Sequence, residues 1–172
     1  MKIISVSIVS GLFLTAVLPA AKAATGTISL SAAVTPTTCV VPANQLTRTI
    51  TLPAMTSASL AGKADGEKIV NQNMAFTFTG CETGLTGVGV KFDFTKDGDY
   101  LTNTGDAEGV KLAITDTSDT KIDTGDTIPS TDYDAAAGTG SVNAKVWAYR
   151  VGTAAPVGGS ISSTATVTVV TN

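Results

Sequence analysis

The chain has 172 residues, of which 15% are charged and none is histidine, and its formal charge is −3. The absence of histidine removes the Ser-His-Asp and Cys-His catalytic arrangements and the commonest protein ligand for metals. A mildly acidic chain also argues against nucleic acid or anionic lipid as a partner. Half-buried strands joined by small-residue turns fit a composition this rich in Thr, Ala, Gly, Val and Ser.

Residues 1–23 have the pattern of an export signal. Lys2 supplies the positive charge, residues 3–18 the apolar run, and residues 21–23 a small-x-small cleavage site. A transmembrane helix is the alternative, but this apolar run is short and lies at the very N-terminus. We therefore expect a mature chain that begins at Ala24, carries a charge of −5 once two lysines are lost, and forms one domain.

The two cysteines, Cys39 and Cys81, both remain in that mature chain. Export delivers them to an oxidising compartment, where a disulfide is the expected state. Two free thiols or a metal pair is the weaker alternative, because the chain has no histidine and no third cysteine. Closing this loop would stabilise the domain by about 4 kcal/mol.

Apolar and polar residues alternate along much of the chain, which is typical of half-buried strands. The clearest case is residues 88–94, and the chain ends in another such segment, residues 164–171. Gly-, Asp- and Asn-rich turns separate the segments, and residues 54–64 could hold a short turn of helix at most. The spacing predicts an all-β, immunoglobulin-like sandwich of six or seven strands. The remaining alternating segments are residues 28–34, 50–52, 74–78, 110–114 and 142–151, and the apolar positions of the last segment are Ala165, Val167 and Val169.

The alternating segment at residues 26–34 is unusual because it comes before the first cysteine. A dangling N-terminal tail is normally polar and disordered. An apolar, alternating tail instead indicates a segment that needs a partner. The alternative is an ordinary first strand of a closed sandwich.

Several short motifs, each present once, follow one another along the chain. They are Gly26-Thr27-Ile28-Ser29-Leu30 with Cys39 thirteen residues after the glycine, Phe76-Thr77-Phe78-Thr79-Gly80-Cys81, Val110-Lys111-Leu112-Ala113-Ile114-Thr115-Asp116, Trp147-Ala148-Tyr149, Gly159, and Ala165-Thr166-Val167. In this order and spacing the chain resembles the type 1 fimbrial subunits, the chaperone-usher pilins, over essentially the whole mature chain. One departure is Thr171, which stands where that family usually has a tyrosine.

The resemblance implies an incomplete immunoglobulin-like β-sandwich that lacks its last strand and is completed by a donor strand from a neighbouring subunit. A periplasmic chaperone would fill the open groove first, and an outer-membrane usher would direct assembly into a surface fimbrium that supports cell adhesion. Identical or related pilin subunits would be the other partners. Strand addition of this kind takes its affinity from backbone hydrogen bonds and its register from alternating side chains.

Carried over residue by residue, the resemblance divides the chain into a signal peptide (1–23), a donor-strand extension (24–35) and a pilin domain (36–172). It implies a disulfide between Cys39 and Cys81 that pins the first strand to the second. Gly159 would begin the last strand. The donor strand would use Gly26, Ile28, Leu30 and Ala32, with the glycine at a place of close approach, and the acceptor groove and chaperone contact would use Ala165, Val167 and Val169.

Other functions find less support in the sequence. The carboxylates lie in turn-like stretches and match no calcium-loop pattern, and Gly87-Val88-Gly89 lacks the third glycine of a nucleotide loop. Trp147 and Tyr149 could form a sugar platform, but an alternating strand favours a core or inter-subunit role. We expect no enzyme activity, metal, cofactor or small-molecule substrate. A self-complete secreted binding module and a minor or adaptor pilin with a ligand-binding role remain as alternatives, whereas the chain has no room for the extra lectin domain of a tip adhesin.

Overall fold

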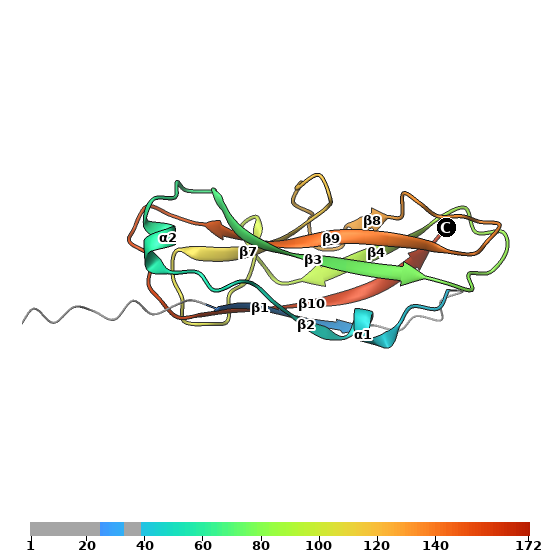
Figure 1. Ribbon diagram of the computed structural model, residues 1–172, viewed down its shortest axis with the longest axis horizontal. Coiled ribbons are helices and arrows are strands. Elements are labelled where there is room, and N and C mark those ends of the chain that lie inside the picture. Colours follow the sequence, from blue (N-terminus) through green and yellow to red (C-terminus); the bar gives the residue numbers. More distant parts are fainter. Residues whose placement is uncertain (1–24, 33–38) are drawn as a thin grey trace, which may run out of the picture.

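The computed structural model describes residues 25–32 and 39–172, which form two sheets packed face to face (Figure 1). Each sheet has five strands. The first sheet, in spatial order, contains β2 (Arg48–Thr51), β1 (Thr25–Ala32), β10 (Ser160–Thr171), β4 (Val88–Phe94) and β8 (Thr127–Pro129). The second contains β3 (Lys68–Phe78), β9 (Gly140–Arg150), β7 (Val110–Thr115), β6 (Tyr100–Leu101) and β5 (Lys96–Asp97).

Two short helices lie in the connections, α1 (Ala43–Leu46) and α2 (Ser57–Ala61). The second falls within residues 54–64, where the sequence allows one turn of helix. A reciprocal cap fixes its start, because the Thr56 hydroxyl accepts from the Ser59 backbone N–H and the Ser59 hydroxyl accepts from the Thr56 backbone N–H, both at 3.1 Å. No helix in the described residues is long and apolar enough to cross a membrane.

The prediction of an all-β, two-layer sandwich is confirmed. Every predicted alternating segment overlaps a strand of the described residues. The first strand ends at Ala32, with Val34 outside the described residues, and Leu52 and Val151 lie one residue beyond β2 and β9. The strand number is larger than six or seven, because β5, β6 and β8 are only two or three residues long. A strand of two or three residues is too short to show an alternation of apolar and polar residues in the sequence. The predicted export signal also lies outside the described residues.

The core lies between the two sheets and uses the inward residues of each strand. Phe76 on β3 and Phe92 on β4 meet across this layer, with their ring centroids 5.8 Å apart in an edge-on arrangement. Both side chains are fully buried, as are Ile28 of β1 and Ile161 of β10. The N-terminal strand is therefore part of the sandwich core.

Candidate functional site

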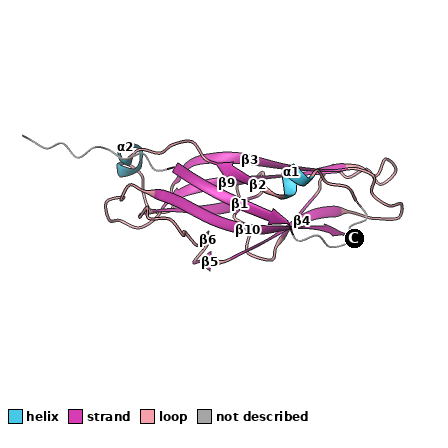
Figure 2. Ribbon diagram, turned by 90° about the horizontal axis from the view of Figure 1, so that it is seen from below, coloured by secondary structure: helices cyan, strands magenta, loops and turns pink. Residues whose placement is uncertain are grey.

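The first strand occupies a central place in the first sheet. It lies between β2 and β10, and Figure 2 shows it running alongside β10 over its full length. With β2 it pairs antiparallel, whereas with β10 it pairs parallel, from Thr25 opposite Ser160 to Ala32 opposite Val167. Among the strands of residues 25–32 and 39–172 this is the one parallel pair.

The side chains of β1 alternate between the core and solvent. Ile28 is 0% exposed and Leu30 is 3% exposed, whereas Ser29 and Ser31 lie on the outer face. Burying each large aliphatic side chain stabilises the fold by about 2 kcal/mol. The two residues expected to act as plugs therefore fill the groove between β2 and β10 of their own chain.

Gly26 faces the same interior as these two residues and lies close to Leu52 and Met55. A Cβ at this position would lie 3.3 Å from Leu52 Cδ1 and 3.6 Å from Met55 Cε. The approach is tight, but the neighbouring atoms belong to side chains that can shift. Ala32 continues the strand in register with Val167.

The last strand provides the other wall of the groove. Ala165, Val167 and Val169 are all buried on its inner face. The alternation extends further toward the N-terminal end of the strand, through Ile161 and Ser163, both fully buried. The Ser163 hydroxyl donates to the Thr102 carbonyl at 2.9 Å, which satisfies the one polar side chain in the row.

Sequence reasoning missed Ile161 and Ser163. The segment 160–164 contains four Ser and Thr residues, which obscure the apolar period. The available signal was spacing alone, since these two positions continue the two-residue step from Ala165 toward the N-terminus. Both belong to the wall that contacts β1.

Gly159 lies directly before β10, where two chain segments approach closely. A Cβ here would lie 2.7 Å from Asp106 Oδ1 and 2.8 Å from the Ala107 backbone nitrogen. The same carboxylate oxygen accepts from the Ser160 backbone N–H at 2.6 Å and from its hydroxyl at 2.8 Å. The glycine therefore allows the 103–107 loop to pack against the start of the last strand.

Cys39 and Cys81 form the predicted disulfide, with a sequence separation of 42. Beside it, the backbones of Val40 and Thr79 exchange hydrogen bonds at 2.8 and 3.0 Å. The bond joins the segment between β1 and α1 to the segment that follows β3. It therefore ties the two sheets together at one end of the sandwich.

Trp147 and Tyr149 lie on the outward side of β9, and neither forms an open aromatic platform. The indole N–H of Trp147 donates to Asp119 Oδ1 at 3.0 Å, and Lys68 Nζ lies 5.2 Å from the centre of the ring. Tyr149 is buried, and this burial raises the pKa of its hydroxyl to about 12. Lys121 Nζ covers its ring at 4.6 Å. These contacts do not favour a sugar-binding site.

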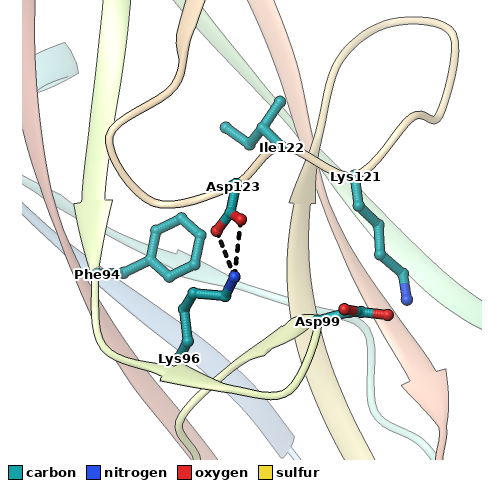
Figure 3. A pocket seen from close by; sticks show the side chains of 6 residues that line it. All are labelled: Phe94, Lys96, Asp99, Lys121, Ile122 and Asp123. Carbon is teal, nitrogen blue, oxygen red and sulfur yellow. Dashed lines mark hydrogen bonds and ion pairs between the residues drawn. The ribbon is translucent and has the colours of Figure 1, made fainter.

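The pocket in Figure 3 has a volume of about 250 Å³, and none of its six lining residues belongs to β1 or β10. Its most prominent contact is an ion pair between Lys96 Nζ and Asp123 Oδ1 at 2.6 Å, and this pair lowers the pKa of Asp123. In the part of the chain that the structure describes, no three acidic or cysteine side chains gather in an arrangement that could hold a metal. The groove along β10 is therefore the candidate functional site.

A two-sheet sandwich whose N-terminal strand lies parallel to its last strand defines the class of the protein as a strand-completed immunoglobulin-like sandwich. The model of the Fimbrial protein family matches residues 25–171, and the chain belongs to that family. It is a structural subunit of surface fimbriae and not an enzyme, which confirms the prediction made from the motifs. No curated protein matches the chain.

Solved structures with the same fold include other fimbrial proteins. The P pilus rod subunit PapA has a TM-score of 0.61 at 14% identity, covering 78% of this chain and 99% of its own. A chaperone-usher pilus, studied for rod uncoiling, has a TM-score of 0.62 at 12% identity, covering 98% of this chain and 100% of its own. A type I fimbria protein and antigen of Burkholderia pseudomallei has a TM-score of 0.50 at 23% identity, covering 88% and 99%.

Proposed function

We propose that this fimbrial subunit polymerises by donor-strand exchange, in which β1 leaves its own groove and enters the groove of a neighbouring copy. The observation that carries the proposal is the place of β1 between β2 and β10, with Ile28 and Leu30 buried in the core. This strand comes first among the described elements, and a tether of six residues, 33–38, joins it to Cys39. It is thus the strand that can be exchanged with least change to the remaining chain.

Removal of β1 exposes two kinds of surface. The facing edges of β2 and β10 lose their backbone partners, and the inner faces of Ile161, Ala165 and Val167, which lie in register with β1, lose a neighbour. An open, apolar edge of this kind leads to aggregation in water. The groove therefore needs an occupant at every stage, which supports a periplasmic chaperone before assembly and a second subunit afterwards.

The same reasoning gives the boundaries of the segments of the chain and the partners of the subunit. Residues 24–35 are the donor extension and residues 36–172 the pilin domain, with export directed by residues 1–23. One of the solved structures with this fold is a chaperone-usher pilus, which supports an outer-membrane usher as the assembly site. The fibre would present the subunit at the cell surface and support adhesion.

The test places a charge on the buried face of β1. Leu30→Asp should abolish the heat-labile ladder of polymers that fimbriae give on a denaturing gel, because a buried, unpaired carboxylate costs several kcal/mol. Ser29→Asp is the matched control, since Ser29 is exposed on the same strand. Normal polymers from the Leu30 variant would exclude β1 as the donor strand.

A closed monomer is the second candidate, and the occupancy of the groove by the chain's own strand favours it. In that case the subunit would neither donate nor accept a strand, and it would act as a self-complete binding module. Protein taken from the cell surface would then run as a single species near the mass of the mature chain, with or without boiling. A ladder that collapses on boiling excludes this second candidate.

A further inference from the structure

β3 is the longest of the strands that lie at an edge of the two sheets in the described residues. It has eleven residues, whereas the other edge strands β2, β8 and β5 have four, three and two. An edge strand offers its unpaired backbone N–H and C=O groups to strands of other chains. The sequence itself protects two of the short edges, because β8 ends in Pro129 and β5 consists of Lys96 and Asp97. The edge of β3 has no such protection in its own sequence.

The composition of β3 favours pairing with a further strand. Residues 69–78 contain no charged residue, glycine or proline, and their β-branched and aromatic residues favour the strand conformation. Three amides stand in a row, Asn71, Gln72 and Asn73. Uncharged segments without proline pair readily with copies of themselves, and amide side chains can add hydrogen bonds between identical rows. This edge therefore fits a second copy of the same chain, which it would meet without charge repulsion.

Two side chains cover the C-terminal half of the edge. Gln45 of α1 accepts from the Thr77 backbone N–H at 2.7 Å, and its amide donates to the Thr77 hydroxyl at 3.0 Å. Arg48 of β2 donates to the Ala75 carbonyl at 3.1 Å, and its guanidinium carbon lies 5.2 Å from the centre of the Phe76 ring. Both side chains thus occupy backbone groups that an added strand would need.

The N-terminal half of the same edge is open. Residues of a strand direct their backbone groups alternately to its two sides, and the register of β3 with β9 is regular from Val70 to Phe78. Asn71 and Asn73 therefore direct their backbone groups to the same side as Ala75 and Thr77. Within residues 25–32 and 39–172, no hydrogen bond from another segment reaches the backbone of Asn71 or Asn73 at this edge. The cover consequently leaves only about half of β3 accessible to an added strand.

Gln45 ties α1 to the edge of β3. The helix has four residues, none of them is fully buried, and no side chain caps its start. Leu46 packs partly against the core. A helix this short has little stability of its own. Without the Gln45 amide we expect α1 to move away from β3, which would free the Thr77 N–H.

We propose that Gln45 and Arg48 close the edge of β3 against a second copy of this chain, which would otherwise add its own β3 there. Two identical edges that pair with each other run antiparallel and would join two sandwiches through one continuous sheet. The cover prevents this lateral association from competing with association through the groove along β10. The inference goes beyond the proposed function, because it concerns neither β1 nor that groove.

The test is Gln45→Ala, with light scattering of the purified subunit over a range of protein concentrations. The variant should associate at a concentration roughly tenfold below that of the wild type, because the freed N–H gains a hydrogen bond in the pair. Asn44→Ala is the matched control, since Asn44 is exposed on the same helix. Thr56→Ala removes the cap of α2 and destabilises the chain without uncovering β3. Both controls should associate like the wild type.

A second substitution locates the contact. Ala75→Lys, added to Gln45→Ala, places a charge on an exposed position of the edge, where two paired copies would bring like charges together. This double variant should return to the association of the wild type. We change Gln45 and not Arg48 because Arg48 lies opposite Leu30, in the groove.

Two outcomes would overturn the proposal. The first is a Gln45→Ala subunit that associates no more than Asn44→Ala. The second is association that Ala75→Lys does not reverse or that Thr56→Ala reproduces, since it would come from general destabilisation. None of these variants changes a residue of β1 or β10, so polymerisation through the groove would be the same in all of them. Failure of donor-strand exchange would therefore leave this result unaffected.

Discussion

Asp119 accepts a hydrogen bond from Lys145 at 2.7 Å, and this contact fastens the 116–121 turn to the outer face of the second sheet. The same carboxylate oxygen accepts from Trp147, and Oδ2 lies 3.2 Å from Lys68 Nζ. Lys145 and then Trp147 are the main causes that lower the pKa of Asp119 from 3.8 to about 2. One carboxylate of the turn thus contacts three side chains of the sheet.

This pKa predicts how the stability of the protein changes in acid. Because the pKa of Asp119 is lower in the folded chain, its stabilising contribution is complete above pH 4 and is lost as the pH falls toward 2. Asp119→Asn removes the charge and keeps a residue that tolerates the φ of +65° found here. Melting temperatures of the two proteins should differ at pH 6 and converge near pH 2, and an equal difference at both pH values would contradict the prediction.

A series of glycine variants tests the close approach before the last strand. Gly159→Ala places a methyl group against the Asp106 carboxylate and the Ala107 nitrogen and should destabilise the protein by about 1–3 kcal/mol. The methyl group of Gly26→Ala would contact side-chain atoms only, so this variant should lower the free energy of unfolding by less than Gly159→Ala. Gly62→Ala, with no atom within 4 Å, is the control and should stay within about 0.5 kcal/mol. Urea unfolding measures all three, and a cost at Gly62 equal to that at Gly159 would refute this order.

Arg150 lies at the end of β9 and is 4% exposed. Its guanidinium donates to the carbonyls of Gly109 at 2.8 Å, of Val151 at 2.5 Å, and of Ala154. Arg150→Met would leave these carbonyls without this donor and should cost about 2–4 kcal/mol. Lys91→Met, at a more exposed position on β4, should lower the free energy of unfolding by much less. Denaturant titration measures both variants. Similar midpoints for the two variants would show that the carbonyl contacts contribute little.

Replacement of Cys39 and Cys81 by serine should lower the melting temperature by roughly 10 °C, because the unfolded chain regains the freedom of a loop closed over 42 residues. Reductant should shift the wild-type protein in the same direction and leave the double variant unchanged. The yield of chaperone-bound subunit should also fall. A melting temperature insensitive to both treatments would mean that the bond is dispensable.

Local patterns in the sequence predict most of this fold. The two-residue period locates β1, β4, β7 and β9 because one face of each strand packs in the core. The disulfide is predictable because the chain has only two cysteines. Ile161 and Ser163 escaped notice because hydroxyl-bearing residues surround them. The parallel direction of β1 was beyond reach, since a two-residue period is the same whichever way a strand runs.

The position of the disulfide has a topological consequence. The covalent ring closes between Cys39 and Cys81, and β1 lies upstream of it, so the strand is not part of the ring. Forming or breaking the pairing of β1 with β2 and β10 therefore changes no covalent bond of the ring. If the groove exchanges its occupant as proposed, a subunit that has been oxidised once keeps the same disulfide throughout.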